Sequence, residues 1–130
     1  MSMTKILIAD DESAVLEIMA RKVASAGYQV IMARNGQEAW DKIQTQLPDI
    51  VLLDMIMPEM DGFQVLTNLR QHPPSNKWIP VVVISTLDKV QNLKEGFDLE
   101  ADHYLTKPCH IEDILKAIKL MLPLIPLRNS

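Results

Sequence analysis

The feature that most constrains the fold is an alternation of short apolar runs with segments of helical period. Four runs are apolar at both odd and even positions, as is typical of strands covered on both faces of a parallel sheet. These runs occupy residues 5–10, 28–33, 49–54 and 79–85, and a weaker candidate occupies 101–107. Helical patterns occupy residues 13–27, 35–48, 61–71, 88–97 and 111–122. The alternation predicts an α/β fold, a doubly wound five-stranded parallel sheet with five helices and right-handed crossovers.

The helical segments carry apolar stripes that predict which side chains face the sheet. The first three stripes consist of Val15, Ile18, Met19 and Val23, then Ala39, Trp40, Ile43 and Leu47, and then Phe63, Leu66 and Leu69. Gly27 is a good residue to end the first helix, and Asn35 is a good N-cap for the second.

Length and composition predict one domain. The chain has 130 residues, 48% of them hydrophobic and 23% charged, which is ordinary for a globular domain with its own core. We expect the domain to span residues 1–130, with a core over 4–121 and a tail or the start of a connector over 122–130. The net charge of −4 argues against a general nucleic-acid or membrane-surface binder, because such partners favour a basic face.

The same features predict a cytoplasmic location. Cys109 is the only cysteine, which excludes an internal disulfide and fits a reducing compartment. The apolar stretch after the N-terminal MSMTK is too short for a signal peptide. The apolar run LMLPLIPL near the C-terminus is far shorter than the ~18–20 residues of a membrane span and contains two prolines.

Polar residues stand where each of four predicted strands ends. In parallel sheets, sites form outside the carboxyl ends of the strands, so these residues are expected to converge on one edge. They are Asp10 and Asp11 after the first strand, Asp54 at the end of the third, Ser85 at the end of the fourth, and Lys107 before Pro108 at the end of the fifth.

This set of groups is suited to phosphoryl transfer. Clustered carboxylates repel one another unless a cation is present. Mg²⁺ is a hard divalent cation that prefers oxygen ligands, so it is the ion expected here. An aspartate can itself be the nucleophile, while a lysine and a hydroxyl stabilise the phosphoryl oxygens. Taken singly, each residue is more simply a helix cap, a turn residue or a solvated charge. Their occurrence together at four strand ends favours the phosphoryl-transfer site.

The sequence resembles the receiver domains of bacterial two-component response regulators over roughly residues 4–121. The segments that carry the resemblance are ILIADDE, PDIVLLDMIMPEMDGF, IPVVVIST and ADHYLTKP, in this order and at these spacings. The resemblance implies a flavodoxin-like fold with strand order 2-1-3-4-5. It also implies a regulatory phosphoacceptor domain rather than an enzyme, one that catalyses only its own phosphoryl transfer and hydrolysis.

The resemblance assigns a role to each candidate residue. Asp54 is the phosphoacceptor. Asp10, Asp11, Asp54 and the backbone carbonyl of Ile56 hold Mg²⁺ or Mn²⁺, with Asp10 acting largely through water. Lys107 pairs with the phosphoryl group and precedes a cis peptide to Pro108. Ser85 and Tyr104 are the switch residues, and the alternative for Tyr104 is a packing residue of the fifth strand.

The resemblance also implies partners. The donor is a phosphohistidine on a sensor histidine kinase or a histidine phosphotransfer protein. Phosphorylation then alters the surface of the fourth helix, fifth strand and fifth helix, which a downstream output domain or protein recognises. A homodimer formed on phosphorylation is compatible with the apolar end of the fifth helix. Direct nucleic-acid and membrane binding are not expected.

Three alternatives remain open at this stage. A phosphatase of the haloacid dehalogenase type also uses a strand-end aspartate with Mg²⁺, but it requires a second aspartate where this chain has Ile56. A flavodoxin would require a phosphate-binding loop after the first strand, where the acidic DDESAV lies. The third alternative is a receiver-like docking module that is never phosphorylated.

Overall fold

The computed structural model describes residues 3–55, 57, 59–86 and 101–129. The predicted helix over 88–97 and the proposed ligand position Ile56 lie outside these residues. Within them, the chain forms five strands, five α-helices and one 3₁₀ turn. In chain order these are β1 (Lys5–Ala9), α1 (Ser13–Ser25), β2 (Gln29–Ala33), α2 (Gly36–Gln46), β3 (Ile50–Asp54), α3 (Gly62–Gln71), η1 (Pro74–Asn76), β4 (Val81–Thr86), β5 (His103–Lys107), α5 (Ile111–Met121) and α6 (Leu124–Arg128).

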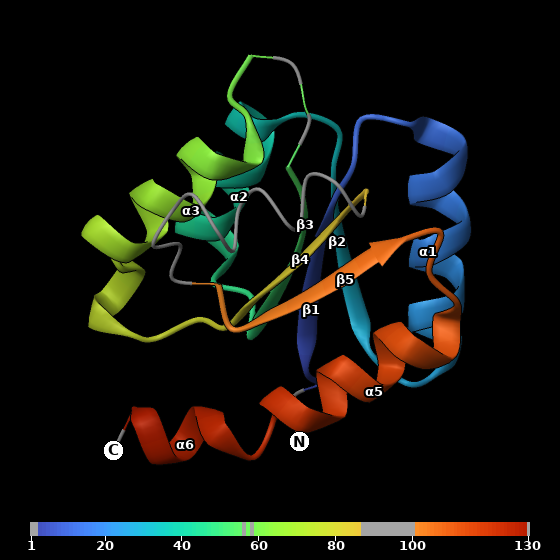
Figure 1. Cartoon of the computed structure of the whole chain (residues 1–130). Coiled ribbons are helices and arrows are strands. Elements are labelled where there is room, and N and C mark those ends of the chain that lie inside the picture. Colours follow the sequence, from blue (N-terminus) through green and yellow to red (C-terminus); the bar gives the residue numbers. More distant parts are fainter. Residues whose placement is uncertain (1–2, 56, 58, 87–100, 130) are drawn as a thin grey trace.

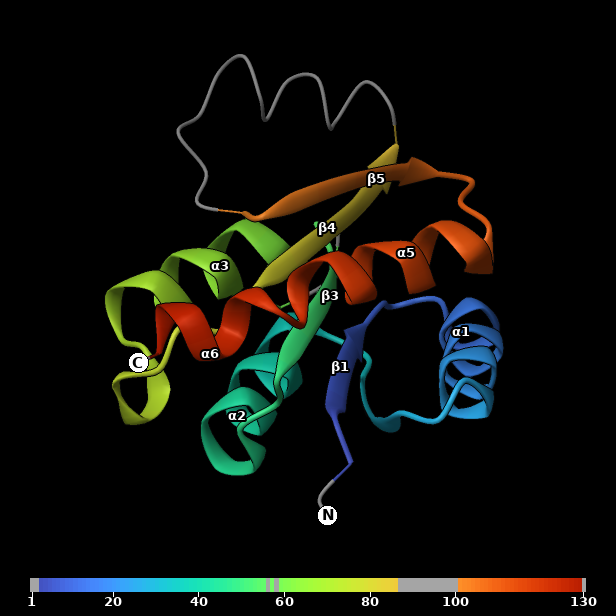
Figure 2. The same ribbon diagram turned by 90° about the horizontal axis from the view of Figure 1, so that it is seen from below.

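The strands form one sheet with the order β2-β1-β3-β4-β5, and every neighbouring pair is parallel. The fold class and strand order predicted from the sequence are therefore confirmed. Figures 1 and 2 show α1 and α5 on one side of the sheet and α2 and α3 on the other. All strands point the same way, so their carboxyl ends meet at the upper edge in Figure 1, while both chain termini lie at the opposite edge.

Each face of the sheet has its own buried core, because successive strand residues point to opposite faces. Leu53 packs with the buried residues of α2 and α3, and Leu52 packs with those of α1 and α5. All five residues of β3 are buried, as its continuous apolar run predicts. The charged end of this strand, Asp54, is thus held at a fixed position by two packed layers.

Helix starts and ends follow local chemistry at α2 and α3. The side chain of Asn35 accepts a hydrogen bond from Glu38 N at 2.7 Å, so the predicted N-cap is confirmed. Asp61 and Gln64 form a reciprocal capping box at the start of α3. Leu47 ends α2 in a left-handed conformation (φ 49°).

Three of the predicted inward-facing residues are wrong. Ile18 on α1 is 54% exposed, and Leu47 and Phe63 are also exposed. The side chains that α1 buries are Leu16, Met19, Ala20 and Val23. All three wrong residues stand at the border of a stripe or at the end of a helix, where a period of 3.6 residues does not decide which way a side chain points.

The C-terminal tail contains a short helix that the sequence analysis did not predict. Pro126 lies in the first turn of α6, where a missing backbone N–H costs nothing. The helix lies at the lower edge of the molecule in Figure 1. Arg128 stacks 4.0 Å from the ring centroid of Trp78, and the side chain of Asn129 exchanges two hydrogen bonds with the backbone of Trp78, at 2.8 and 3.1 Å.

Candidate functional site

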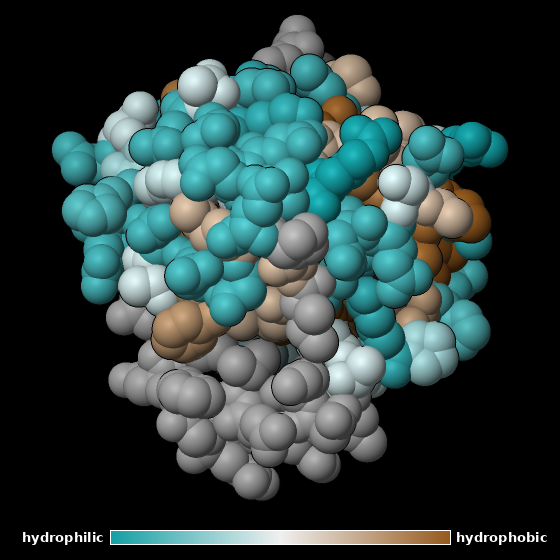
Figure 3. Space-filling view, turned by 90° about the horizontal axis from the view of Figure 1, so that it is seen from above, coloured by the Kyte–Doolittle hydropathy of each residue, from teal (hydrophilic) through white to brown (hydrophobic). Residues whose placement is uncertain are grey.

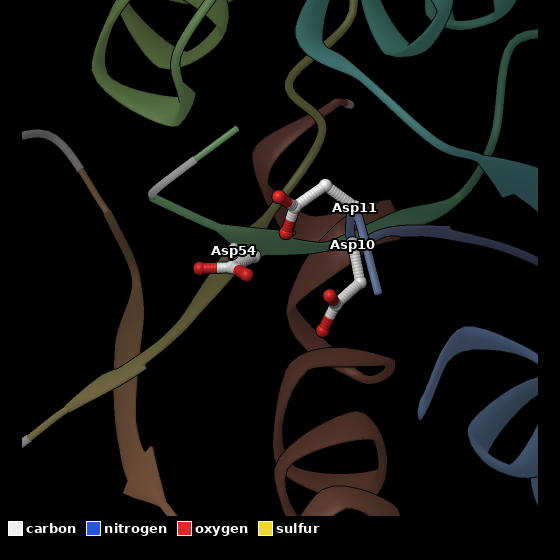
Figure 4. Close-up of side chains that lie close together, drawn as sticks. All are labelled: Asp10, Asp11 and Asp54. Carbon is white, nitrogen blue, oxygen red and sulfur yellow. The ribbon is translucent and has the colours of Figure 1, made fainter. Parts of the chain in front are cut away.

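Three carboxylates meet at the carboxyl edge of the sheet. Asp10 and Asp11 follow β1, and Asp54 ends the neighbouring strand β3. One oxygen from each of the three lies within 4.8 Å of the others, and Figure 4 shows them side by side. Asp10 and Asp54 are buried, with 2% and 6% of their surfaces exposed, whereas Asp11 is exposed. The cluster therefore has a buried floor and an open side.

Lys107 reaches this cluster from the end of β5. Its Nζ donates hydrogen bonds to Asp54 Oδ2 at 3.1 Å and to Asp10 Oδ2 at 3.3 Å. Because β5 lies two strands away from β3, the lysine side chain must cross the end of β4 to make these contacts. The peptide bond between Lys107 and Pro108 is cis.

The neighbours of Lys107 alter its acidity. Burial opposes the charged form, but the hydrogen bonds and negative charges of Asp54 and Asp10 outweigh it, so the pKa of Lys107 is raised. The ammonium group therefore stays protonated at neutral pH and offsets part of the carboxylate charge.

The backbone holds the floor of the cluster in place. Asp10 Oδ1 accepts a hydrogen bond from Glu12 N at 2.9 Å, and Asp10 N donates to Ala33 O at 3.1 Å. The Asp10 carboxylate thus contacts the start of α1 through one oxygen and Lys107 through the other. A carboxylate fixed in this way keeps its position when a ligand arrives.

Ser85 and Tyr104 lie on β4 and β5, the two strands that follow β3 toward one edge of the sheet. Ser85 is buried near the end of β4, one residue beyond Ile84, which pairs with Asp54. Tyr104 is partly buried and packs against the core cluster shared with α2 and α3. Ser85 is paired with Thr106 and Val83 with Tyr104, so the two candidate switch residues are two positions apart in register and on the same face of the sheet.

The surface around the cluster is strongly hydrophilic. Figure 3 shows polar residues covering most of the described part of this edge, with apolar residues gathered at the side where α1 lies. The three carboxylates supply only oxygen ligands, which suits a hard divalent cation. The arrangement can hold such a cation beside a buried nucleophilic carboxylate and an ammonium group.

Comparison with known proteins decides the family. The sequence pattern of the response regulator receiver domain matches residues 6–119. The chain belongs to this family. It is a receiver domain of two-component signalling, and so a regulatory domain rather than a classical enzyme.

Individual relatives agree with this assignment. The response regulator MprA of Mycolicibacterium vanbaalenii is 37% identical over 118 residues, which cover 91% of this chain and 50% of the relative. The chain thus spans about half the length of the curated relatives it matches.

No described helix of the receiver domain has the length and apolar composition needed to cross a bilayer.

Solved receiver structures resemble the whole fold. The receiver domain of the Francisella response regulator 1452 has a TM-score of 0.82 at 32% identity, covering 92% of this chain and 97% of that one. The receiver domain of a signal transduction histidine kinase from Syntrophus aciditrophicus has a TM-score of 0.83 at 30% identity, covering 92% and 90%.

Sequence reasoning missed two groups of residues near the strand starts. Asp102 accepts hydrogen bonds from Arg70 Nη2 at 2.7 Å and from Val81 N at 2.8 Å, although 32 and 21 residues separate it from these partners. The contact of Trp78 with Asn129, at the end of α6, spans 51 residues. No local pattern marks such pairs, because they depend on how the strands are ordered.

Proposed function

We propose that Asp54 accepts a phosphoryl group from a phosphohistidine on a sensor histidine kinase or a histidine phosphotransfer protein. The observation that carries this proposal is the contact of Lys107 with both Asp54 and Asp10, beside the third carboxylate of Asp11. A buried carboxylate beside an ammonium group is a suitable nucleophile.

In the transfer, an Asp54 carboxylate oxygen attacks the phosphorus atom. The new bond joins this oxygen to phosphorus, while the bond from phosphorus to the donor's imidazole nitrogen breaks and its electron pair stays on the imidazole. Lys107 stabilises negative charge on the phosphoryl oxygens through its ammonium group. Ser85 donates a hydrogen bond to one of these oxygens.

The residues at this edge fit Mg²⁺ or Mn²⁺. Asp11 and Asp54 would hold the ion directly, Asp10 largely through water, and the backbone carbonyl of Ile56, outside the described residues, would add another oxygen. When bound, the ion neutralises charge that builds up on the phosphoryl oxygens. Three carboxylates gathered within 4.8 Å support this assignment, since they would repel one another without a cation.

The consequence of phosphorylation would be a switch in surface shape. Ser85 moves toward the phosphoryl group, and the space it leaves is filled by Tyr104, which lies on the same face two positions away in register. The altered surface includes β5 and α5, together with the helix predicted over 88–97. A downstream output domain or protein would recognise this altered surface. A homodimer formed on phosphorylation would use the same surface.

The proposal treats residues 1–130 as a single receiver domain acting in the cytoplasm, where its kinase would present the phosphohistidine. The domain works either alone or within a longer regulator or hybrid kinase. It has no direct contact with nucleic acid or membrane, which is consistent with a net charge of −4.

The test is labelling by acetyl phosphate in the presence of Mg²⁺, followed by intact-mass measurement. The wild type should gain one phosphoryl group, and Asp54→Asn should gain none. Asp41→Asn, an exposed site on α2 that keeps its contact with Gln37, is the matched control and should label like the wild type. Absence of labelling in the wild type would favour the docking module that is not phosphorylated.

A further inference from the structure

The chain that follows Asp54 must be held in place for the site to work. Met55 and Met57, the first described residues of the loop between β3 and α3, are buried. The loop ends at Gly62, whose N–H donates to Met55 O at 3.1 Å. A Cβ on Gly62 would lie 2.5 Å from the carbonyl oxygen of Asp54, so α3 begins directly against the loop.

A second close contact comes from α2. Gly36 is the first residue of this helix and is buried. A Cβ built on Gly36 would overlap the carbonyl group of Met60 and lie 2.8 Å from the Met60 Cβ. The φ angle of Gly36 is not in the left-handed region, so this glycine is required for space rather than for backbone conformation.

Met60 is also fixed from the opposite side. Asn68 Nδ2 on α3 lies 3.6 Å from Met60 Sδ, and the Met60 side chain packs against the core between the sheet and these helices. The obstacle to a Cβ at position 36 is backbone, and backbone cannot yield without moving the loop. The start of α2 and the side of α3 therefore hold the loop between them.

We propose that Gly36 is a positioning residue of the phosphorylation site, acting through Met60 on the loop that follows Asp54. The proposal rests on the proposed function only in assigning the loop a role in metal binding and phosphorylation. Any side chain at position 36 pushes the Met60 carbonyl away from α2 and displaces the loop. The contacts of Lys107 with Asp54 and Asp10 involve none of these atoms and stay in place.

The experiment compares Gly36→Ala with Gln37→Ala, an exposed position in the same helical turn. Backbone amide NMR spectra of the metal-free proteins report loop position without any phosphorylation. We expect Gly36→Ala to shift the amides of Met55, Met57 and Met60, and Gln37→Ala to leave them unchanged. A Mg²⁺ titration followed by the same signals should give a Kd about tenfold weaker for Gly36→Ala only. Shifts confined to α2, with a wild-type Mg²⁺ Kd, would overturn the proposal.

A second variant serves if Gly36→Ala lacks the wild-type circular dichroism spectrum. Met60→Gly removes the side chain that anchors the loop to α3 and leaves α2 intact. It should also weaken Mg²⁺ binding, and an unchanged Kd would contradict the proposal. Where both variants fold, their effects on the Kd should not be additive, because both displace the same loop; full additivity would show that the two residues act on different parts of the site. If the wild type binds no Mg²⁺, the proposed function fails, while the metal-free amide shifts still test the role of Gly36.

Discussion

Lys107 donates a hydrogen bond to Asp54 at 3.1 Å, across 53 residues of sequence. The contact joins the ends of two strands that are not neighbours in the sheet, β3 and β5. It places a cation on a carboxylate that is almost fully buried, where an uncompensated charge would be costly. The same cation touches Asp10, so one side chain links both buried carboxylates of the site.

Replacing this lysine should abolish most phosphoryl transfer. Lys107→Met keeps the aliphatic stem and removes the ammonium group to which we assign the stabilisation of the phosphoryl oxygens. We expect the rate of labelling by acetyl phosphate to fall about 100-fold, the effect typical of losing one such donor. Lys116→Met, at an exposed position on α5, is the control. Equal labelling rates for the two variants would contradict this role of Lys107.

The raised pKa of Lys107 predicts how stability depends on pH. Burial lowers this pKa, but the contacts with Asp54 and Asp10 raise it further, so it lies above its ordinary value of 10.5 in the folded state. The stabilising contribution is therefore fully present below about pH 10 and is lost as the pH rises through the raised pKa. Urea denaturation should show a constant free-energy difference between wild type and Lys107→Met from pH 7 to 9, which shrinks only at higher pH. A difference that already shrinks near pH 8 would mean that the pKa is lowered instead.

The contacts of Asp102 should matter for stability and not for chemistry. Arg70 and Asp102 form an ion pair in which both side chains are 14% exposed, and Asp102 also accepts from Val81 N at the start of β4. Asp102→Asn keeps the shape and removes the charge. We expect the free energy of unfolding to fall by about 1.5–3 kcal/mol, the range for hydrogen bonds to charged groups. Chemical denaturation measures this free energy, and Asp113→Asn, at an exposed position, is the control. If the free energy of unfolding of Asp102→Asn falls no more than that of the control, the prediction is contradicted.

The sequence predicted the elements whose signals are local. Continuous apolar runs located the strands, and polar residues at their ends located the site, because parallel strands bring those ends to one edge. The orientation of Ile18 and the partners of Asp102 could not be predicted in this way. Ile18 stands at the border of an apolar stripe, and the partners of Asp102 lie far away from it in sequence.

The tail shows a further limit of sequence patterns. The sequence analysis expected a tail or the start of a connector over residues 122–130 and no helix there. The structure has α6 at Leu124–Arg128, and Pro126 is tolerated because a proline in the first helical turn displaces no hydrogen bond. The strand ends, by contrast, predicted that Lys107 and Asp54 meet at one edge of the sheet, and only the pairing of Lys107 with a phosphoryl group depends on the family resemblance.

Releasing α6 should alter the surroundings of Trp78. Arg128 stacks on the Trp78 ring, and the Asn129 side chain accepts a hydrogen bond from Trp78 N and donates one to Trp78 O. We expect the double substitution Arg128→Ala with Asn129→Ala to shift Trp78 fluorescence to longer wavelength, since the ring becomes more hydrated. The stability loss should be about 1 kcal/mol, because an exposed cation–π contact is weak. A Trp40→Phe background isolates the signal, and unchanged emission there would show that α6 does not cover Trp78 in solution.

The lifetime of the phosphorylated state should depend on Ile56, which stands two residues after the proposed phosphoacceptor Asp54. This position lies outside the described residues, and its side chain is aliphatic. Hydrolysis requires a water molecule aimed at phosphorus, and an aliphatic side chain has no atom that can hydrogen-bond such a water. We expect slow loss of phosphate from the wild type and a several-fold faster loss from Ile56→Asn, followed as release of inorganic phosphate after the donor is removed. Ile56→Val keeps the aliphatic character and should match the wild type. Rapid loss from the wild type, unaltered in Ile56→Asn, would show that water reaches the phosphoryl group without help from this position.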